Sequence, residues 1–264
     1  MDAVDRTRTP AEIYDELFVP ALFRQWGAIV ADAARIGLGD RVLDVACGTG
    51  VLACAALDRV GSEGAVAGLD ANPDMLSVAR RKSSCVEWRE GRAESLPYAD
   101  ASFDAVASQF GMMFFDDRPA ALREMMRVLR PGGRMAVAVC DAVDNSPGYA
   151  LLVRLLQRLF GDRVADAFRA PFVLGDPKRL RSICAEAGIA GASVAQREGQ
   201  VRFASIESLI STERACIWTL GGMLDDAQFA RLFEAARQEF KPFAAADGTI
   251  AFAMPALIVT AGKA

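Results

Sequence analysis

Between residues 41 and 140, short apolar runs alternate with segments whose apolar residues recur at helical spacing. The runs predict strands at 41–46, 65–70, 85–90, 103–110 and 134–140. The intervening pattern predicts helices, among them 51–60 and 118–129. Strands that alternate with helices form a mainly parallel sheet, so we predict an α/β domain with helices on both faces.

The two ends of the chain follow other patterns. Thr9, Pro10 and Glu12 form a capping-box signature that opens a first helix, and a second helical stretch covers about 21–36. The last strand pattern, 249–261, is interrupted by Pro255, which predicts a bulge or an edge position. Between residue 141 and that strand we predict an extended segment at 194–205 and helices at 149–160, 177–187, 206–220 and 226–240.

We divide the chain into four parts. Residues 1–36 would form N-terminal helices that act as a lid, 37–141 the ligand-binding core, 142–248 helical cap insertions with one strand, and 249–264 the final strand of the core sheet. The predicted fold is doubly wound and Rossmann-like, with a mainly parallel sheet, a terminal antiparallel strand and a helical cap.

Composition excludes several classes of chemistry. The 264 residues include no histidine, so His-based acid and base catalysis, Ser-His and Cys-His nucleophile pairs and His-containing metal sites are excluded, and we expect no metal. The net charge of −4 disfavours a nucleic-acid partner. The chain has no apolar run of about 18 residues, which predicts no membrane span. Six cysteines without a CxxC pair indicate reduced thiols and a cytoplasmic location.

The segment VLDVACGTG, residues 42–50, indicates a nucleotide or nucleoside site, because a glycine turn between a strand and a helix lets a ligand approach the backbone. Gly48, Gly50 and Ala53 also fit the GxGxxA pattern of dinucleotide-binding proteins. Asp44 would be poorly placed beside a pyrophosphate but suits a cationic amino group, and Asp70 is positioned for ribose hydroxyls. A ligand with ribose and positive charge but no phosphate is S-adenosylmethionine.

Four ordered motifs add a family resemblance. VLDVACGTG, GLDANPDML, GRAESLPYADASFDAV and REMMRVLRPGGRMAVAV resemble the successive motifs of class I S-adenosylmethionine-dependent methyltransferases. They are most similar to the small-molecule branch that includes the ubiquinone and menaquinone methyltransferases, over roughly residues 37–140. The resemblance implies transfer of the sulfonium methyl group to a small molecule by in-line displacement.

The resemblance also implies residue roles. Asp44 would hold the methionine amino end through the turn or a water, and Asp70 would bind both ribose hydroxyls. The other implied cofactor contacts lie near the ribose and methionine, around the adenine and at the reaction centre: Ala46, Gly48 and Gly50; Ala71, Met75, Ala93 and Glu94; and Gln109. Two positions depart from the family. Ala46 replaces a glycine, which is tolerable if its φ is negative, and Arg92 replaces an acid that accepts from the adenine amino group.

The acceptor is expected to be a largely apolar small molecule, because QFGMMFF at 109–115 and the apolar face of 149–160 follow the predicted strands. Candidate acceptor contacts are Tyr14, Phe23, Trp26, Phe110 and Met113. The sequence identifies no catalytic residue. Without histidine, a base for a hydroxyl acceptor would be a carboxylate, a tyrosine such as Tyr14, or water.

Three alternatives stay open on the sequence alone. A nicotinamide-dependent oxidoreductase shares the glycine turn, although none of the three tyrosines is followed four positions later by lysine. A non-catalytic regulatory protein that binds S-adenosylmethionine would share every cofactor motif. A nucleic-acid or protein methyltransferase is disfavoured by the net charge.

Overall fold

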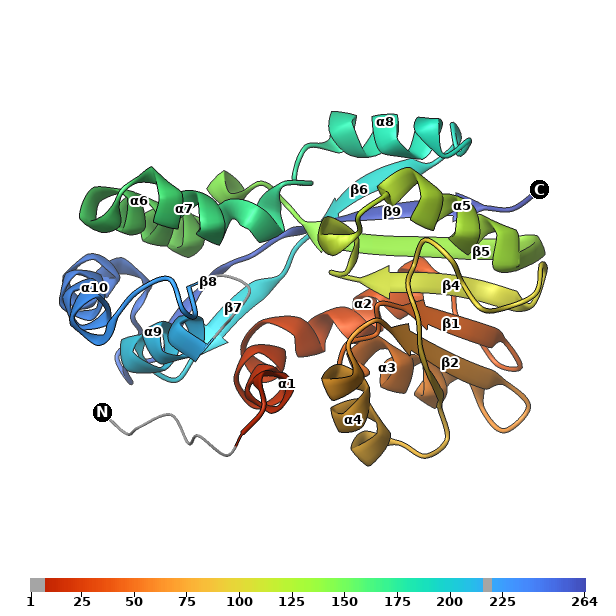
Figure 1. Cartoon of the computed structure of the whole chain (residues 1–264), viewed down its shortest axis with the longest axis horizontal. Helices are drawn as coiled ribbons and strands as arrows, with labels where there is room; N and C mark the ends of the chain where they lie inside the picture. Colours follow the sequence, from red (N-terminus) through yellow and green to blue (C-terminus); the bar gives the residue numbers. More distant parts are fainter. Residues whose placement is uncertain (1–7, 216–219) are drawn as a thin grey trace.

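The computed structural model describes residues 8–215 and 220–264 and is built around a seven-stranded sheet (Figure 1). The strand order is β3-β2-β1-β4-β5-β9-β6. β9 runs opposite to the other six strands, so its pairings with β5 and β6 are antiparallel and the remaining pairings of this sheet are parallel. The bounds are β1 Arg41–Val45, β2 Ala65–Asp70, β3 Glu87–Glu90, β4 Phe103–Gln109, β5 Leu129–Cys140, β6 Ser193–Arg197 and β9 Ala256–Gly262. The predicted fold class, with its mainly parallel sheet and antiparallel terminal strand, is confirmed.

Helices cover both faces of this sheet (Figure 1). One layer contains α2 and α3, which pack together, and the other contains α5 and α8. The bounds are α2 Arg24–Ala33, α3 Val51–Val60, α4 Pro73–Lys82, α5 Arg118–Val128 and α8 Pro177–Glu186. Burial on both faces explains why the strands read as apolar runs: Val42, Leu43 and Val45 of β1 are all buried.

The N-terminal segment is one continuous helical run where the sequence predicted two helices. It passes from α1 (Pro10–Ile13) through a π-helix, η1 (Tyr14–Phe23), into α2. The predicted capping box is present, since Thr9 Oγ1 accepts from the Glu12 N–H at 3.3 Å and Glu12 Oε2 accepts from the Thr9 N–H at 2.9 Å. Pro20 lies inside η1, where its missing N–H interrupts α-helical hydrogen bonding.

Two predicted strands are each divided between two sheets. The extended segment 194–205 becomes β6 in the main sheet and β7 (Gln200–Phe203) in a two-stranded sheet with β8 (Ile250–Ala253). The final strand pattern is likewise broken at Pro255 into β8 and β9. The Met254 N–H donates to the Gly199 carbonyl at 2.8 Å. This hydrogen bond links the two positions at which the chain passes from one sheet to the other. The sequence predicted a bulge or an edge position at Pro255. The strand is interrupted there, whereas the edge alternative is wrong for β9, which lies between β5 and β6.

The remaining helices form a cap beside the β7–β8 sheet, seen on the left of Figure 1. They are α6 (Pro147–Phe160), α7 (Asp162–Arg169), α9 (Ile206–Ala215) and α10 (Asp226–Glu239), with the short turns η3 (Val143–Asn145), η4 (Ala170–Phe172) and η5 (Lys241–Phe243). A further short turn, η2 (Met112–Phe114), follows β4. The predicted helix 206–220 is observed as α9, and residues 216–219 lie outside the described part. Helix α7 was not predicted.

Candidate active site

A cavity of about 360 Å³ opens where β1, β2, β4 and β5 end. Ala46, Asp70, Gln109 and Cys140 line it from these four strand ends, and the N-terminal helical run and the cap close its other sides. Ligands of open α/β sheets bind at this edge, and the volume lies in the range of small-molecule sites.

The turn from β1 to α3 has the backbone that a close ligand approach requires. Gly48 has φ +54° and Gly50 has φ +88°, in the left-handed region that favours glycine. A Cβ atom at Gly50 would also lie 2.6 Å from the Trp88 ring. Gly48 lines the cavity, whereas Gly50 does not, so the glycine requirement at position 50 comes from the backbone and from Trp88.

Ala46 departs from the condition set by the sequence. Alanine would be tolerable if its φ were negative, and this condition is not met, because φ of Ala46 is +57°. A left-handed alanine costs about 1–2 kcal/mol of conformational free energy, and this strain is held at the cavity wall. The neighbouring turn makes room for the methyl group, because Gly111 carries no Cβ and one there would lie 2.5 Å from the Ala46 Cβ.

Asp44 lies beneath the glycine turn and is not a lining residue of the cavity. Its side chain is 1% exposed, and its Oδ2 accepts from the Ala53 N–H at 2.9 Å. Burial, with a smaller contribution from Asp70, raises the pKa of Asp44 well above its usual range. Its Oδ1 has no hydrogen-bond partner within residues 8–215 and 220–264, so the predicted hold on the methionine amino end, through the turn or a water, stays a prediction.

The raised pKa predicts a pH-dependent cost of folding at Asp44. The folded protein keeps the Asp44 carboxyl protonated at pH values where the unfolded chain has lost that proton. The contribution of Asp44 to the free energy of unfolding is therefore fully present below the ordinary pKa of 3.8 and is lost as pH rises through the folded pKa. We expect the Asp44→Asn variant to lose less stability than wild type between pH 4 and pH 8, because the unfolded carboxyl is half ionised at its ordinary pKa of 3.8.

Urea unfolding of the ligand-free protein across that range measures this effect. The slope against pH is compared, because a buried amide adds a constant cost at every pH. Asp58→Asn, which alters an exposed carboxylate on α3, is the matched control and should keep the wild-type slope. Equal slopes for Asp44→Asn and wild type would show that Asp44 does not titrate in this way.

Asp70 connects the turns after β1 and β2. Its Oδ2 accepts from the Gly48 N–H at 2.7 Å and its Oδ1 from the Asn72 N–H at 2.9 Å. Burial raises the pKa of Asp70, partly offset by these backbone hydrogen bonds. Each carboxylate oxygen keeps a further lone pair, and the side chain lines the cavity. Asp70 therefore fits the predicted role of binding two ribose hydroxyls.

The predicted adenine contacts meet on one side of the cavity. Ala71, Met75, Ala93 and Glu94 all line it, from the end of β2, from α4 and from the loop after β3. Their apolar surface suits a flat aromatic base.

Arg92 stands at the rim of this region and is held by two acids. Its guanidinium forms an ion pair with Asp116, and its Nε lies 3.5 Å from Glu94 Oε2. Glu94 Oε1 in turn accepts from the Asp116 N–H at 2.9 Å. Both carboxylates are therefore already engaged, which supports the prediction that the adenine amino group is recognised weakly.

We test this with Arg92→Asn, which supplies a carbonyl acceptor without adding charge. The variant should favour S-adenosylhomocysteine over its analogue without the 6-amino group more than wild type does, by about threefold to tenfold, the value of one net hydrogen bond. Calorimetric titration of both ligands measures the ratio. Arg80→Asn, at an exposed position on α4, is the control. A wild-type ratio that is already large, or one that Arg92→Asn leaves unchanged, contradicts the prediction.

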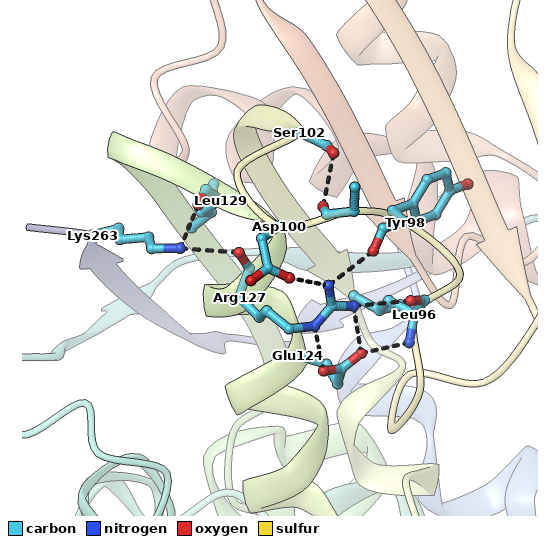
Figure 2. Close-up of polar contacts among 9 residues, drawn as sticks. Leu96, Tyr98, Asp100, Ser102, Glu124, Arg127, Leu129 and Lys263 are labelled. Atoms are coloured by element: carbon cyan, nitrogen blue, oxygen red, sulfur yellow. Dashed lines mark hydrogen bonds and ion pairs between the residues drawn. The ribbon is translucent and has the colours of Figure 1, made fainter.

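The loop that carries Ala93 and Glu94 is fixed from behind by Arg127 of α5 (Figure 2). The guanidinium donates to the Leu96 carbonyl at 2.9 Å, the Tyr98 carbonyl at 2.9 Å and Asp100 Oδ1 at 2.7 Å. Glu124, one turn earlier, binds the same guanidinium and accepts from the Leu96 N–H at 2.8 Å. This network supports the loop without touching the cavity.

The predicted acceptor contacts divide into lining and core residues. Tyr14, Phe23, Phe110 and Met113 line the cavity. Trp26 does not: it is fully buried, packs edge-on against Phe110 with ring centroids 5.5 Å apart, and belongs to the core. The proposal of Trp26 as an acceptor contact is therefore wrong.

Gln109 links the sheet to the N-terminal helical run at the predicted reaction centre. Its Nε2 donates to the Phe23 carbonyl at 3.1 Å, and its Oε1 has no hydrogen-bond partner within residues 8–215 and 220–264. An acceptor atom beside the cavity fits the predicted contact with the methionine part of the cofactor.

Sequence reasoning missed several lining residues. They lie on the N-terminal run, in the two turns, at the end of β5, in the cap and between β8 and β9: Phe18, Leu22, Thr49, Asn72, Cys140, Phe168, Phe172, Glu213 and Met254. Tyr149 also lines the cavity, as the apolar face of 149–160 indicated. Glu213 is the notable omission, because it is a carboxylate only 2% exposed and α9 gave no sign of facing a ligand.

The comparison with protein families agrees with this architecture. The sequence profile of the ubiE/COQ5 methyltransferase family matches residues 12–151, more than half of the chain, and the chain belongs to this family. Membership confirms the predicted family, which is one of methyltransferases and not of nicotinamide oxidoreductases.

Named relatives point the same way. A "Ubiquinone/menaquinone biosynthesis C-methyltransferase" of Xanthomonas axonopodis pv. citri is 34% identical over 195 residues, covering 68% of this chain and 77% of the relative. The chloroplastic "2-phytyl-1,4-beta-naphthoquinone methyltransferase" of Arabidopsis thaliana is 38% identical over 138 residues, 48% of this chain. The chain spans about half the length of the Arabidopsis relative, 53%.

A solved structure shares the fold. The Haemonchus contortus phosphoethanolamine N-methyltransferase 2, in complex with phosphomonomethylethanolamine and S-adenosylhomocysteine, superposes with a TM-score of 0.59 at 17% identity. The alignment covers 98% of this chain and 59% of that one.

Proposed function

We propose that this chain transfers the methyl group of S-adenosylmethionine to a carbon atom of a small, largely apolar hydroquinone-type molecule. The observation that carries the proposal is one continuous cavity that joins Gly48 and Asp70, the cofactor residues, to the aromatic side chains of the cap. The named relatives act on naphthoquinones or in ubiquinone and menaquinone biosynthesis, and the Xanthomonas relative is a C-methyltransferase.

Different cavity residues would bind different parts of the cofactor. Asp70 holds the ribose, Ala71, Met75 and Ala93 hold the adenine, and Gln109 fixes the methionine part. When bound, S-adenosylmethionine supplies an electrophilic methyl group on a sulfonium. The aromatic walls exclude water and place a ring acceptor in line with that methyl, and such orientation contributes about 7–11 kcal/mol to lowering the barrier.

The charge of the cavity suits these ligands. Its described lining contains four carboxylates, Asp70, Glu94, Asp116 and Glu213, and one cationic side chain, Arg92. A negative wall favours a cationic cofactor and a neutral acceptor over an acceptor with carboxylate or phosphate groups. A hydroquinone meets this requirement, and its electron-rich ring can attack a methyl cation equivalent, which an oxidised quinone cannot.

Two measurements test the proposal. S-Adenosylhomocysteine should raise the melting temperature, as a ligand selective for the folded state does, whereas NADH should not. Incubation with S-adenosylmethionine and a reduced 1,4-naphthohydroquinone, kept under argon, should then add one methyl group to a ring carbon, detected by mass spectrometry and NMR. Binding without turnover over a panel of hydroquinones, amines and thiols would favour the non-catalytic regulatory alternative.

Location and partners are predictions of the sequence. No helix within residues 8–215 and 220–264 is long and apolar enough to cross a bilayer. The five cysteines among the described residues are free, which supports the proposed cytoplasmic location. The small-molecule acceptor is the one partner we propose, without nucleic acid.

A further inference from the structure

Arg118 holds the backbone of the short turn η2 that follows β4. It is the first residue of α5, whose start is fixed by Asp117, because the Asp117 side chain accepts from the Ala120 N–H at 2.8 Å. The Arg118 Nε donates to the Met112 carbonyl at 3.3 Å, and its Nη2 donates to the Met113 carbonyl at 2.9 Å. A planar guanidinium that reaches two consecutive carbonyls from a helix fixes both the position and the orientation of this turn.

The segment around this turn forms a wall of the cavity. Every residue from 109 to 116 lines the cavity except Met112, which is fully buried. The lining side chains include Met113 and the aromatic rings of Phe110 and Phe114. Apolar and aromatic surface of this kind suits a flat ring, so the position of the η2 backbone sets where an acceptor ring lies.

Phe110, directly after β4, holds backbone strain just before the turn, because its φ of +56° lies in the left-handed region that large side chains rarely adopt. Such a conformation persists only where the surrounding structure holds it. The Phe110 N–H donates to the Ala138 carbonyl at 2.9 Å. The Phe110 ring packs against those of Phe23 and Trp26. Since η2 is a single 3₁₀ turn of three residues, it depends on contacts such as those of Arg118 at its other end.

Arg118 acts from outside the cavity. Its side chain is half-buried and does not line the cavity, so it can affect a bound acceptor only through the backbone that it holds. Arg118 and Arg179 line a separate cleft with residues of α5 and α8. Burial, with a smaller contribution from Arg179, lowers the pKa of Arg118.

The adenine side of the same segment has its own support. Glu94 Oε1 accepts from the Asp116 N–H at 2.9 Å, and Asp116 forms an ion pair with Arg92. Arg118 takes part in neither contact, so removal of its side chain should leave the adenine region in place. We therefore expect Arg118 to affect the acceptor and not the cofactor.

We propose that Arg118 is a positioning residue for methyl transfer, which fixes the η2 wall so that a ring carbon of the acceptor, and not its hydroxyl oxygen, faces the methyl group. The inference rests on the proposed function, because it requires a hydroquinone-type ring in the cavity. The hydroxyl oxygen is attached to the neighbouring ring carbon, so a small rotation of the ring brings the oxygen to the methyl group instead. A shift of about 1 Å in a reacting atom costs about 100-fold in rate.

Methylation at carbon and methylation at oxygen have the same balance of atoms and electrons. In both reactions the methyl–sulfur bond breaks with its electron pair left on sulfur, the acceptor atom forms a bond to the methyl carbon, and one proton leaves the acceptor. S-Adenosylhomocysteine is the second product in both. Because the reactants are the same, a change in the product ratio between variants reports a change in how the ring lies.

The test compares Arg118→Ala with Arg179→Ala, which removes the neighbouring exposed cation of α8. Both variants should bind S-adenosylhomocysteine with wild-type affinity in calorimetric titration. With 1,4-naphthohydroquinone under argon, we expect Arg118→Ala to lower kcat/KM for ring methylation by about 10-fold to 100-fold and to raise the share of O-methylated product by about fivefold or more. Chromatography and NMR measure this share. Arg179→Ala should keep the wild-type rate and ratio.

The product ratio separates positioning from stability, because a variant that is only less stable contains less folded enzyme at an unchanged ratio. Arg118→Lys keeps a donor without the planar fork and should recover part of the ring selectivity. If Arg118→Ala does not fold, Arg118→Gln, which keeps one amide donor group, takes its place.

An unchanged ratio in the folded variant, or the same change in Arg179→Ala, overturns the role of Arg118 alone. If wild type binds S-adenosylhomocysteine but does not methylate a ring carbon of the hydroquinone, the proposed function fails and the role of Arg118 fails with it.

Discussion

Replacing Asp70 by alanine should weaken S-adenosylhomocysteine binding by about 1.5–3 kcal/mol, or roughly 10-fold to 150-fold, the value of hydrogen bonds to a charged group. The carboxylate lies at the end of β2 and lines the cavity where ribose is expected. It also accepts from the N–H groups of Gly48 and Asn72, so its loss loosens both turns of the cofactor site. Calorimetric titration with the folded variant measures the effect.

Two comparisons make this result specific. Asp70→Asn keeps one acceptor oxygen and should fall between wild type and alanine. Asp74→Ala removes an exposed carboxylate of α4 that does not line the cavity, so its affinity should stay at the wild-type value. A folded Asp70→Ala protein with unchanged affinity would remove Asp70 from the cofactor site.

Substitution of Arg127 by alanine should destabilise the protein by about 2–3 kcal/mol, because a guanidinium that holds three acceptors of one loop is lost. Figure 2 shows the side chain between Glu124 and the loop that contains Leu96, Tyr98 and Asp100. This loss is well below the sum of three hydrogen bonds to a charged group, because the side chain is 31% exposed and solvent screens its ion pairs. Urea denaturation gives the change in the free energy of unfolding.

Lysine at this position should not restore the loss, because an ammonium group cannot reach the acceptors that the planar fork reaches. Arg123→Ala, on the same helix with a single backbone contact at 3.4 Å, is the control and should change stability little. Since the loop carries Ala93 and Glu94, Arg127→Ala should also weaken cofactor binding modestly. A stability equal to that of Arg123→Ala would mean that the network contributes nothing measurable.

The core of the fold could be predicted because its local and global signals agree. Parallel strands buried on both faces leave unbroken apolar runs, and the capping box at Thr9 marks a helix start as the sequence indicated. The sequence pattern predicted one strand where a single extended segment contributes strands to two sheets. Nothing in the spacing of 194–205 or 249–261 shows that the chain changes sheets near Gly199 and Pro255, because that depends on packing against the cap.

The cofactor side of the site was more predictable than the acceptor side. Ala71, Met75, Ala93 and Glu94 follow from motifs that lie at strand ends, which the topology brings together. The burial of Trp26 could not be predicted without knowing the path of the N-terminal helical run. The π-helix in this run changes which residues lie on the same face.

Two further residues depended on backbone and tertiary packing. Ala46 has a left-handed φ beside Gly111, which is distant in sequence, and Glu213 reaches the cavity from the cap helix α9. No local sequence pattern predicts the φ of Ala46 or the position of Glu213.

The interior position of β9 has a consequence for how the protein is made. A ribosome delivers the chain from its N-terminus, so β5 and β6 exist long before residues 256–262 emerge to fill the place between them. Until then β5 exposes an unpaired edge and β6 has no neighbour in the main sheet, a state in which other chains can add to the open strand. The seven-stranded sheet is thus completed only after residues 256–262 have been synthesised.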